Sequence, residues 1–198
     1  MTNYLVKNYL VSYNRSGNTW VRYILEYLTH QPTWGHQKYS ISERMGEKSN
    51  ITILHSEPIV IKRHQIIPNE IKNTDRVILL LRDYQDCIWN SMDCKWEKFE
   101  LQYRKYWDLI KFFDGFKGKK LLLQYENLTE FWIHSLLNFL EVDDSGVTEF
   151  FKNIEYHKEQ SFSIYDNSIN TRNGEIPTYT EEEMDYMEKV LSKIFSGK

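Results

Sequence analysis

The segment between residues 8 and 28 constrains the fold of this chain more than any other. Residues 9–11 form a short apolar run, long enough for one buried strand. From Trp20 to Leu28, apolar side chains recur at the spacing of an amphipathic helix. A strand that runs through a tight polar turn into a helix directs backbone N–H groups and the positive helix end at one point. The segment therefore predicts an anion site, with Arg15, Ser16 and Thr19 as added donors; an ordinary polar helix cap is the alternative.

The turn is not a Walker A loop. That motif has the pattern G-x-x-x-x-G-K-[ST], and its first glycine and its lysine are both missing here. Chemistry on a magnesium-bound triphosphate is therefore disfavoured, although a small nucleotide or metabolite kinase of the same fold class stays open as an alternative.

The rest of the chain alternates β-prone and helical segments. This alternation predicts an α/β fold, a single-domain three-layer parallel sheet flanked by helices, over residues 1–198. Two segments, 31–49 and 160–178, are expected to be irregular, the first as a loop or lid with some helix inside it. Further strands are expected at 51–54, 59–64, 76–81 and 120–125, and further helices at 86–92, 97–113, 128–140, 147–156 and 181–195.

The net charge of −3 gives the chain no overall basic field, so we expect no nucleic-acid partner, and any anion must be held by local cations. Cys87 and Cys94 lack the spacing of a metal site and are interpreted as free thiols of a reducing compartment. No secretory leader and no run of membrane-spanning length is present. We therefore expect a soluble, cytoplasmic protein.

Charged and aromatic side chains follow the predicted strands at their carboxyl ends. Ligands of open parallel sheets bind beyond these ends. Lys62 and His64 end one strand and share a face, since side chains alternate along a strand. Arg82 follows the next strand, and Tyr125 with Glu126 follows a third. We expect these groups to meet Arg15 at one edge of the sheet, around an anion.

Several segments match motifs of the PAPS-dependent sulfotransferases. Residues 13–20 (YNRSGNTW) resemble that family's 5′-phosphosulfate loop, Y-P-[KR]-S-G-[TN]-T-W, with Asn14 in place of the proline. Residues 62–64 (KRH) are similar to its K-[TS]-H. Residues 76–86 (RVILLLRDYQD) look like its 3′-phosphate motif, K-x-I-x-x-x-R-[ND]-P-x-D, with Tyr84 in place of the proline. The resemblance therefore includes Arg15, Lys62, His64 and Arg82, which follow the predicted strands at their carboxyl ends.

Matches continue in order through the later part of the chain. Residues 125–128 (YENL) resemble the family's Y-E-[DN]-L, 161–162 (SF) its S-F pair, and 172–174 (RNG) its closing R-K-G loop without the usual W-K. Asn90 stands where the family has a serine that binds the 3′-phosphate, and the adjacent Ser91 could serve instead. The chain is shorter than is usual for the family, which implies trimmed segments on the acceptor side.

The resemblance implies a P-loop-NTPase-like sulfotransferase fold and transfer of a sulfuryl group from PAPS to a hydroxyl or amine, with release of PAP and without a metal. The acceptor would be a glycan or a small alcohol or phenol. His64 would be the catalytic base, Lys62 would bind the sulfuryl group, and Arg15 would stabilise the bridging oxygen. The implied cofactor-binding residues are Arg15, Ser16, Gly17, Asn18, Thr19, Trp20, Arg82, Asn90, Ser91, Tyr125, Phe162, Arg172, Asn173 and Gly174.

Three questions stay open in the sequence. Trp20 is by default a core residue, whereas the resemblance makes it the stacking partner of the adenine. A module that binds PAP or another nucleotide without catalysis is a non-enzymatic alternative, but holding a cofactor alone needs neither Lys62 nor His64. Residues 31–49 and 92–107 are expected to border the acceptor, and their aromatic rings suit a sugar face or an aromatic ring equally. For His64 we expect an ordinary pKa, about 6.5.

Overall fold

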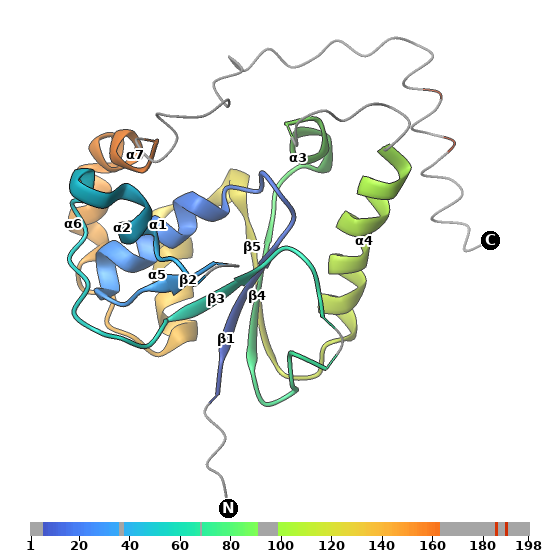
Figure 1. Cartoon of the computed structure of the whole chain (residues 1–198), viewed down its shortest axis with the longest axis horizontal. Coiled ribbons are helices and arrows are strands. Elements are labelled where there is room, and N and C mark those ends of the chain that lie inside the picture. The colour runs from blue at the N-terminus through green and yellow to red at the C-terminus, as the bar shows by residue number, and fades with distance from the viewer. Residues whose placement is uncertain are drawn as a thin grey trace, which may run out of the picture.

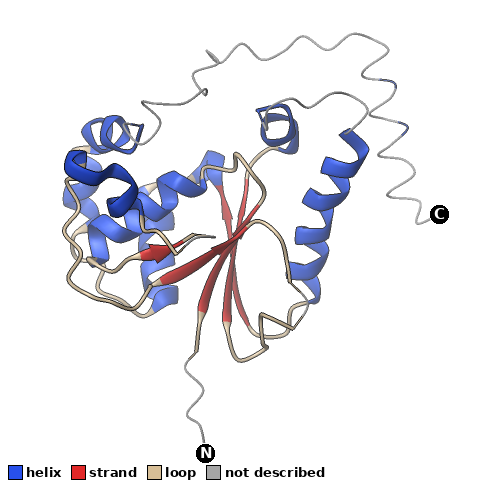
Figure 2. Ribbon diagram, viewed as in Figure 1, coloured by secondary structure: helices blue, strands red, loops and turns tan. Residues whose placement is uncertain are grey.

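The computed structural model describes residues 6–35, 38–67, 69–90 and 99–162, together with Asp185 and Lys189. It contains a five-stranded parallel sheet in the order β2-β3-β1-β4-β5 (Figure 2). The strands are β1 (Asn8–Ser12), β2 (Thr33–Trp34), β3 (Val60–Arg63), β4 (Arg76–Leu81) and β5 (Lys119–Gln124). The central strand β1 lies between β3 and β4, so the chain leaves β1 toward one edge of the sheet and later returns to the other side. In such sheets the reversal beside the first strand is the usual place of the ligand.

Helices cover both faces of the sheet, as the alternation of segments predicted (Figure 1). One face carries α1 (Asn18–Thr29), α2 (Ile41–Met45), α5 (Glu130–Leu140), α6 (Val147–Lys152) and α7 (Ile154–Phe162), and the other carries α3 (Tyr84–Asn90) and α4 (Phe99–Gly115). Short 3-10 helices, η1 (Gly46–Lys48) and η3 (Tyr125–Asn127), follow α2 and β5.

Side chains of β1 and β4 alternate between the two cores. Leu10 and Ile78 pack with α1 and α5, whereas Val11 and Leu79 pack with α3 and α4. All four are almost completely buried. A strand covered on both faces has an uninterrupted apolar sequence, which is why residues 76–81 were recognisable as a strand.

Two predictions on the edge of the sheet are wrong. Residues 51–54 are not a strand: Ile51 packs into the core, and the Leu54 N–H donates to the carbonyl of His30 instead of to a neighbouring strand. The edge strand is β2, inside the segment expected to be irregular. Two residues are too few for a periodic pattern, and tertiary contacts decide where this strand forms.

The expected helix at 147–156 is two helices, since Asn153 ends α6 with non-helical backbone angles. α7 then continues to Phe162, so the segment expected to be irregular from residue 160 begins in a helix. α3 begins two residues earlier than predicted because the Asp83 side chain accepts a hydrogen bond from the Asp86 N–H. The helix predicted at 181–195 lies outside the described residues, apart from Asp185 and Lys189.

The position of β2 and α2 depends on a buried carboxylate. Glu26 of α1 is fully buried, and its oxygens accept hydrogen bonds from the backbone N–H groups of Thr33, Ile41 and Ser42 at 2.7–2.9 Å, and from the Thr33 hydroxyl. Ile41 and Ser42 form the first turn of α2, where a carboxylate also offsets the helix dipole. One side chain therefore fixes both elements against α1.

One helical turn before Glu26, the buried Arg22 completes this network. Its guanidinium donates to the Thr33 hydroxyl and carbonyl, each at 2.7 Å, and to the Tyr39 carbonyl at 2.8 Å. Two opposite charges in a low-dielectric interior are tolerated when their donors and acceptors are engaged. The segment 33–45 is thereby held beside β3.

No helix in the described part of the chain has the length and apolar character needed to cross a bilayer.

Replacing Glu26 with glutamine tests this network. The substitution keeps the shape but removes the negative charge and places an NH₂ group against backbone N–H donors. We expect the free energy of unfolding in urea to fall by about 1–3 kcal/mol, the cost of unsatisfied buried polar groups. Glu155→Gln, at an exposed carboxylate paired with Lys158, should change it by less than about 0.5 kcal/mol. Equal effects of the two substitutions would contradict the role given to Glu26.

Candidate functional site

The turn between β1 and α1 has an unusual backbone. Arg15 and Gly17 both have positive φ angles, 66° and 80°, and Gly17 is the N-cap residue of α1. A left-handed conformation is costly for arginine, and such conformations cluster at ligand sites. Neighbouring N–H groups in conformations of this kind converge into a concave binding site for anions.

The first turn of α1 has neither a side-chain cap nor an acidic residue. The contrast with α2 is clear, because Ser40 and Glu43 cap that helix with reciprocal hydrogen bonds. Backbone N–H groups at an uncapped helix start carry the positive end of the helix dipole. The N-terminus of α1 is therefore suited to an anion, as the sequence predicted.

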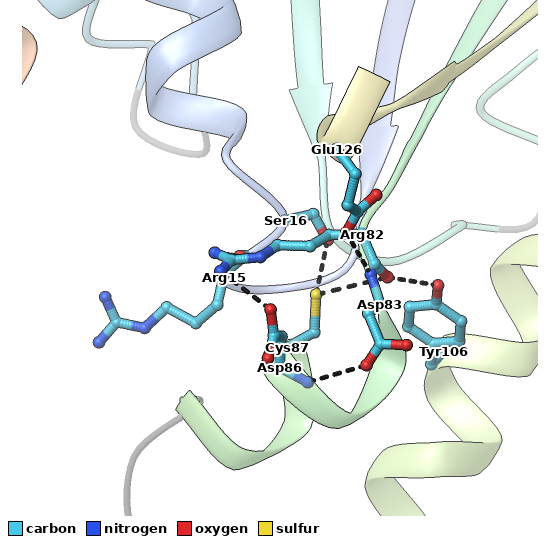
Figure 3. A network of polar contacts seen from close by, with 8 residues as sticks. All are labelled: Arg15, Ser16, Arg82, Asp83, Asp86, Cys87, Tyr106 and Glu126. Atoms are coloured by element: carbon cyan, nitrogen blue, oxygen red, sulfur yellow. Dashed lines mark hydrogen bonds and ion pairs between the residues drawn. The ribbon is translucent and has the colours of Figure 1, made fainter. Parts of the chain in front are cut away.

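Arg15 adds a positive charge to this position. Its guanidinium makes no hydrogen bond or ion pair with any described residue, and Figure 3 shows it extending away from the polar cluster around Arg82. Its carbonyl oxygen, in contrast, accepts a hydrogen bond from Arg82 Nη1 at 3.3 Å. The backbone of Arg15 is fixed while its positive group stays available to a ligand.

Ser16 points into the protein. The residue is fully buried, and its hydroxyl lies 3.3 Å from the Cys87 thiol of α3 (Figure 3). Burial raises the pKa of Cys87 to about 11, so the thiol is neutral. Cys87 is a free thiol, as predicted, whereas Cys94 lies outside the described residues. The Ser16 backbone N–H is also engaged, because it donates to the Tyr13 carbonyl at 3.4 Å, so Ser16 holds the turn in place.

Gly17 lies directly under the ring of Tyr125. A Cβ atom at position 17 would come within 2.1 Å of this ring, so only glycine fits. The Arg82 guanidinium is stacked on the same ring, 4.8 Å from its centroid. Tyr125 thus joins the end of β5 to the β1–α1 turn and to the end of β4, three segments that the sequence placed at one edge.

Arg82 is anchored from several sides (Figure 3). Its Nη2 forms an ion pair with Asp86 at 3.1 Å, and its carbonyl accepts a hydrogen bond from Tyr106 of α4 at 2.7 Å. Glu126 accepts the N–H of the following residue, Asp83, at 2.9 Å. The guanidinium is partly exposed and has five N–H donors, so these contacts leave donors for an anionic ligand.

His64 has a defined tautomer. Its Nδ1 lies 2.8 Å from the carbonyl oxygen of Ser12, which can only accept, so Nδ1 carries the proton and Nε2 has a free lone pair. Burial, together with the positive charges of Lys62 and Arg22, lowers the pKa of His64 to about 4. The expectation of an ordinary pKa is wrong, and the imidazole is a neutral base at neutral pH.

Lys62 is a partly buried cation. Burial and the charges of Arg22 and Arg44 lower its pKa to about 8. Its ammonium group forms no hydrogen bond or ion pair with any described residue. Its partner in the sheet is Leu10, and Ser12 is two residues further along β1, so Lys62, Ser12 and His64 lie on one face. The predicted pairing of Lys62 with His64 is therefore present.

Asn18 connects this face to α1. It is buried, and its Nδ2 donates to the Ser12 hydroxyl at 2.8 Å, next to the carbonyl that orients His64. Its Oδ1 is also buried and has no hydrogen-bond partner among the described residues. The start of α1 and the base are thus linked through Ser12.

Trp20 and Phe162 have different environments. Trp20 is half-buried and stacked on Tyr23, with ring centroids 5.6 Å apart, and it also contacts Phe150 at 5.9 Å. These contacts belong to the core, and stacking of Trp20 on an adenine stays a prediction.

Phe162 is 64% exposed at the end of α7. Thr19 lies half-buried in the first turn of α1.

Part of the predicted 3′-phosphate site lies outside the described residues, namely Ser91, Arg172, Asn173 and Gly174. For Asn90, at the end of α3, the backbone alone is described.

Sequence reasoning missed Arg22 and Arg44, whose charges contribute, after burial, to the lowered pKa of Lys62. Arg22 interrupts the apolar sequence of α1, and an arginine between buried residues was the available signal. Arg44 lies in a segment without periodicity, where no sequence pattern distinguishes it.

No protein-family model matches the chain, and a search of curated proteins finds no match either. Among the described residues, no group of three or more histidine, cysteine, aspartate or glutamate side chains could hold a metal ion.

A cation held without a counter-ion should cost stability. Lys62→Met removes the ammonium group and keeps the aliphatic stem, so we expect the free energy of unfolding at neutral pH to rise by about 1 kcal/mol or more. The difference in unfolding free energy between Lys62→Met and the wild-type protein should shrink as pH rises from about 8 to 10.5. Over that range folded Lys62 loses its proton while the unfolded residue keeps it, so the wild-type protein becomes more stable.

Lys117→Met, at an exposed lysine, is the matched control and should change stability by less than about 0.5 kcal/mol. Chemical unfolding at pH 7 and pH 10 measures both variants. A loss of stability in Lys62→Met would show that the ammonium is compensated.

Proposed function

We propose that this protein is a PAPS-dependent sulfotransferase with the P-loop-like fold of that family. The observation that carries the proposal is the meeting of two features at one edge of the sheet. One is the uncapped start of α1 beside the Arg15 guanidinium, which has no polar partner among the described residues; both suit an anion. The other is a neutral, oriented imidazole, His64, beside the Lys62 ammonium group, which has no partner in the described part of the chain either. An anionic donor and a proton acceptor are what sulfuryl transfer to a hydroxyl requires.

The residues fit the donor in charge and in hydrogen-bonding capacity. The N–H groups at the start of α1 would hold the 5′-phosphate, and Arg82, anchored on the Arg15 carbonyl, would bind the 3′-phosphate. Tyr125 would border the donor above Gly17, and Trp20 would stack on the adenine. When bound, PAPS supplies an activated sulfuryl group: its S–O bond to the 5′-phosphate breaks as a new S–O bond forms to the acceptor, and PAP leaves with the electron pair.

Each reacting group then has one task. His64 Nε2 accepts the proton of the acceptor hydroxyl, while the Ser12 carbonyl stabilises the imidazolium through Nδ1. Lys62 opposes the negative charge on the sulfuryl oxygens, and Arg15 opposes the charge that develops on the bridging oxygen. Because arginine stays protonated, Arg15 contributes charge and not a proton.

Two other functions fit less well. A kinase would need the lysine of the Walker motif, which this turn lacks. A module that only binds a nucleotide would have no use for a buried histidine whose free nitrogen is oriented by a carbonyl. The lowered pKa values of His64 and Lys62 also support a catalytic role over a purely binding one.

Replacing His64 with asparagine tests the mechanism. Asparagine keeps a polar group but cannot accept the proton, so kcat for sulfuryl transfer should fall by about 10²–10⁴. PAP affinity should change little, because the base does not contact the cofactor phosphates. Transfer of labelled sulfate from PAPS to a panel of glycans, phenols and alcohols, together with calorimetric titration of PAP, measures both quantities.

The pH profile distinguishes the base from a merely structural residue. At limiting PAPS, kcat/KM should rise through about 4, where His64 becomes neutral, and fall above about 8, where Lys62 loses its charge. The acidic limb should vanish in His64→Asn. Full activity of this variant would place the base elsewhere, and failure of every acceptor and of PAP binding would reject the proposed function.

A further inference from the structure

We propose that the acceptor carries a negative charge of its own, and that Arg44 on α2 binds it. This inference rests on the proposed function and adds the chemical class of the acceptor to it. Arg44 is exposed, belongs to no motif considered above, and comes from the segment that the Arg22–Glu26 network holds beside β3.

The topology of the sheet separates the donor side from the acceptor side. Arg15 follows β1 and Arg82 follows β4, whereas Arg44 follows β2, which lies at the other edge. β3 lies between β2 and β1 and carries Lys62 and His64 at its end. A donor over β1 and β4 therefore leaves the region over β2 and β3 to the acceptor, with the base between them.

The position of α2, which carries Arg44, follows from the contacts of the segment that leads into it. Trp34 of β2 pairs with Ile61, so Gly35 continues level with Lys62. Arg22 then holds the Tyr39 carbonyl, and Glu26 holds the start of α2 at Ile41. The Arg44 charge lies near enough to Lys62 to lower the pKa of that ammonium group.

Two acidic groups next to α2 are engaged by other donors. Glu26 accepts from backbone and hydroxyl donors, and the Glu43 carboxylate accepts the Ser40 N–H at 2.7 Å as the helix cap. Neither the Arg44 guanidinium nor the Lys62 ammonium group forms a hydrogen bond or ion pair with a described residue, the nearby Glu47 included. Neighbouring positive charges of this kind favour an anionic ligand.

The negative charge of the sulfuryl group would interact with Lys62 and Arg15. It would not neutralise the positive charge of Arg44. A carboxylate or sulfate on the acceptor, away from the reacting hydroxyl, would match it. Aromatic rings lie in the same segment: Tyr39 is 55% exposed, and the Lys38 ammonium lies 5.4 Å from the centroid of the Trp34 ring. Such rings can pack against an anionic saccharide or an anionic phenol, and the test distinguishes these two sources.

The test compares acids with their neutral amides. Two matched pairs are titrated into the PAP-saturated protein: methyl glucuronide with methyl glucuronamide, and 4-hydroxyphenylacetate with its amide. In at least one pair the acid should bind about tenfold more tightly, the effect of one charge-assisted contact. The pair that shows the preference identifies a saccharide or a phenol as the source.

Three variants test whether Arg44 causes the preference for the acid over its amide. Arg44→Gln should reduce the acid-to-amide ratio to near one without changing PAP affinity, and Arg44→Lys should retain part of it. Arg104→Gln removes an equally exposed arginine from α4, on the other face of the sheet, and should leave the ratio unchanged.

The outcomes separate the inference from the proposed function. If PAP binds but acids and amides bind equally, or none of the four compounds binds, the inference is wrong and the sulfotransferase proposal stands. A preference that survives Arg44→Gln also overturns it. If PAP itself does not bind, the proposed function fails, and the inference fails with it.

Discussion

The uncapped first turn of α1 is the feature on which the rest of this site depends. A helix that starts without a side-chain cap leaves its N–H groups to water or to a ligand, and here no acidic residue takes that place. Gly17 permits the turn, Tyr125 covers it, and Asn18 ties it to Ser12 and so to His64. The segment between residues 8 and 28 thereby also positions the proposed anion site and the proposed base.

The site shows the usual conflict between stability and function. Lys62 keeps a charge that burial and two arginines oppose. His64 is kept neutral by burial and by the charges of Lys62 and Arg22, and Arg15 adopts a left-handed backbone. Other contacts offset this loss of stability: apolar side chains are buried on both faces of the sheet, and the polar groups of the Arg22–Glu26 network are hydrogen-bonded. A bound anion would reduce the repulsion between Lys62 and the neighbouring arginines. The same repulsion would therefore destabilise the free protein and favour binding of an anionic ligand.

The sequence predicted the parallel sheet, the helices on both faces and the contact of Arg82 with the Arg15 turn and Tyr125, because periodicity and strand ends are local properties. It did not predict β2, which forms where Glu26 binds Thr33, nor the loss of the expected strand at 51–54. The depressed pKa of His64 was missed for the same reason: Arg22, which is remote in sequence, contributes to it. Tertiary electrostatics has no signature in a local pattern.

The most direct test of the central claim, an anion site for PAP at the start of α1, is a thermal-shift titration with PAP against ATP and magnesium. PAP at a hundredfold excess over its Kd should stabilise the protein by about 2.7 kcal/mol. ATP with magnesium should stabilise it much less, since the turn has no Walker lysine. Arg15→Gln should reduce the stabilisation by PAP. Equal stabilisation by both nucleotides, or none by PAP, would contradict the account.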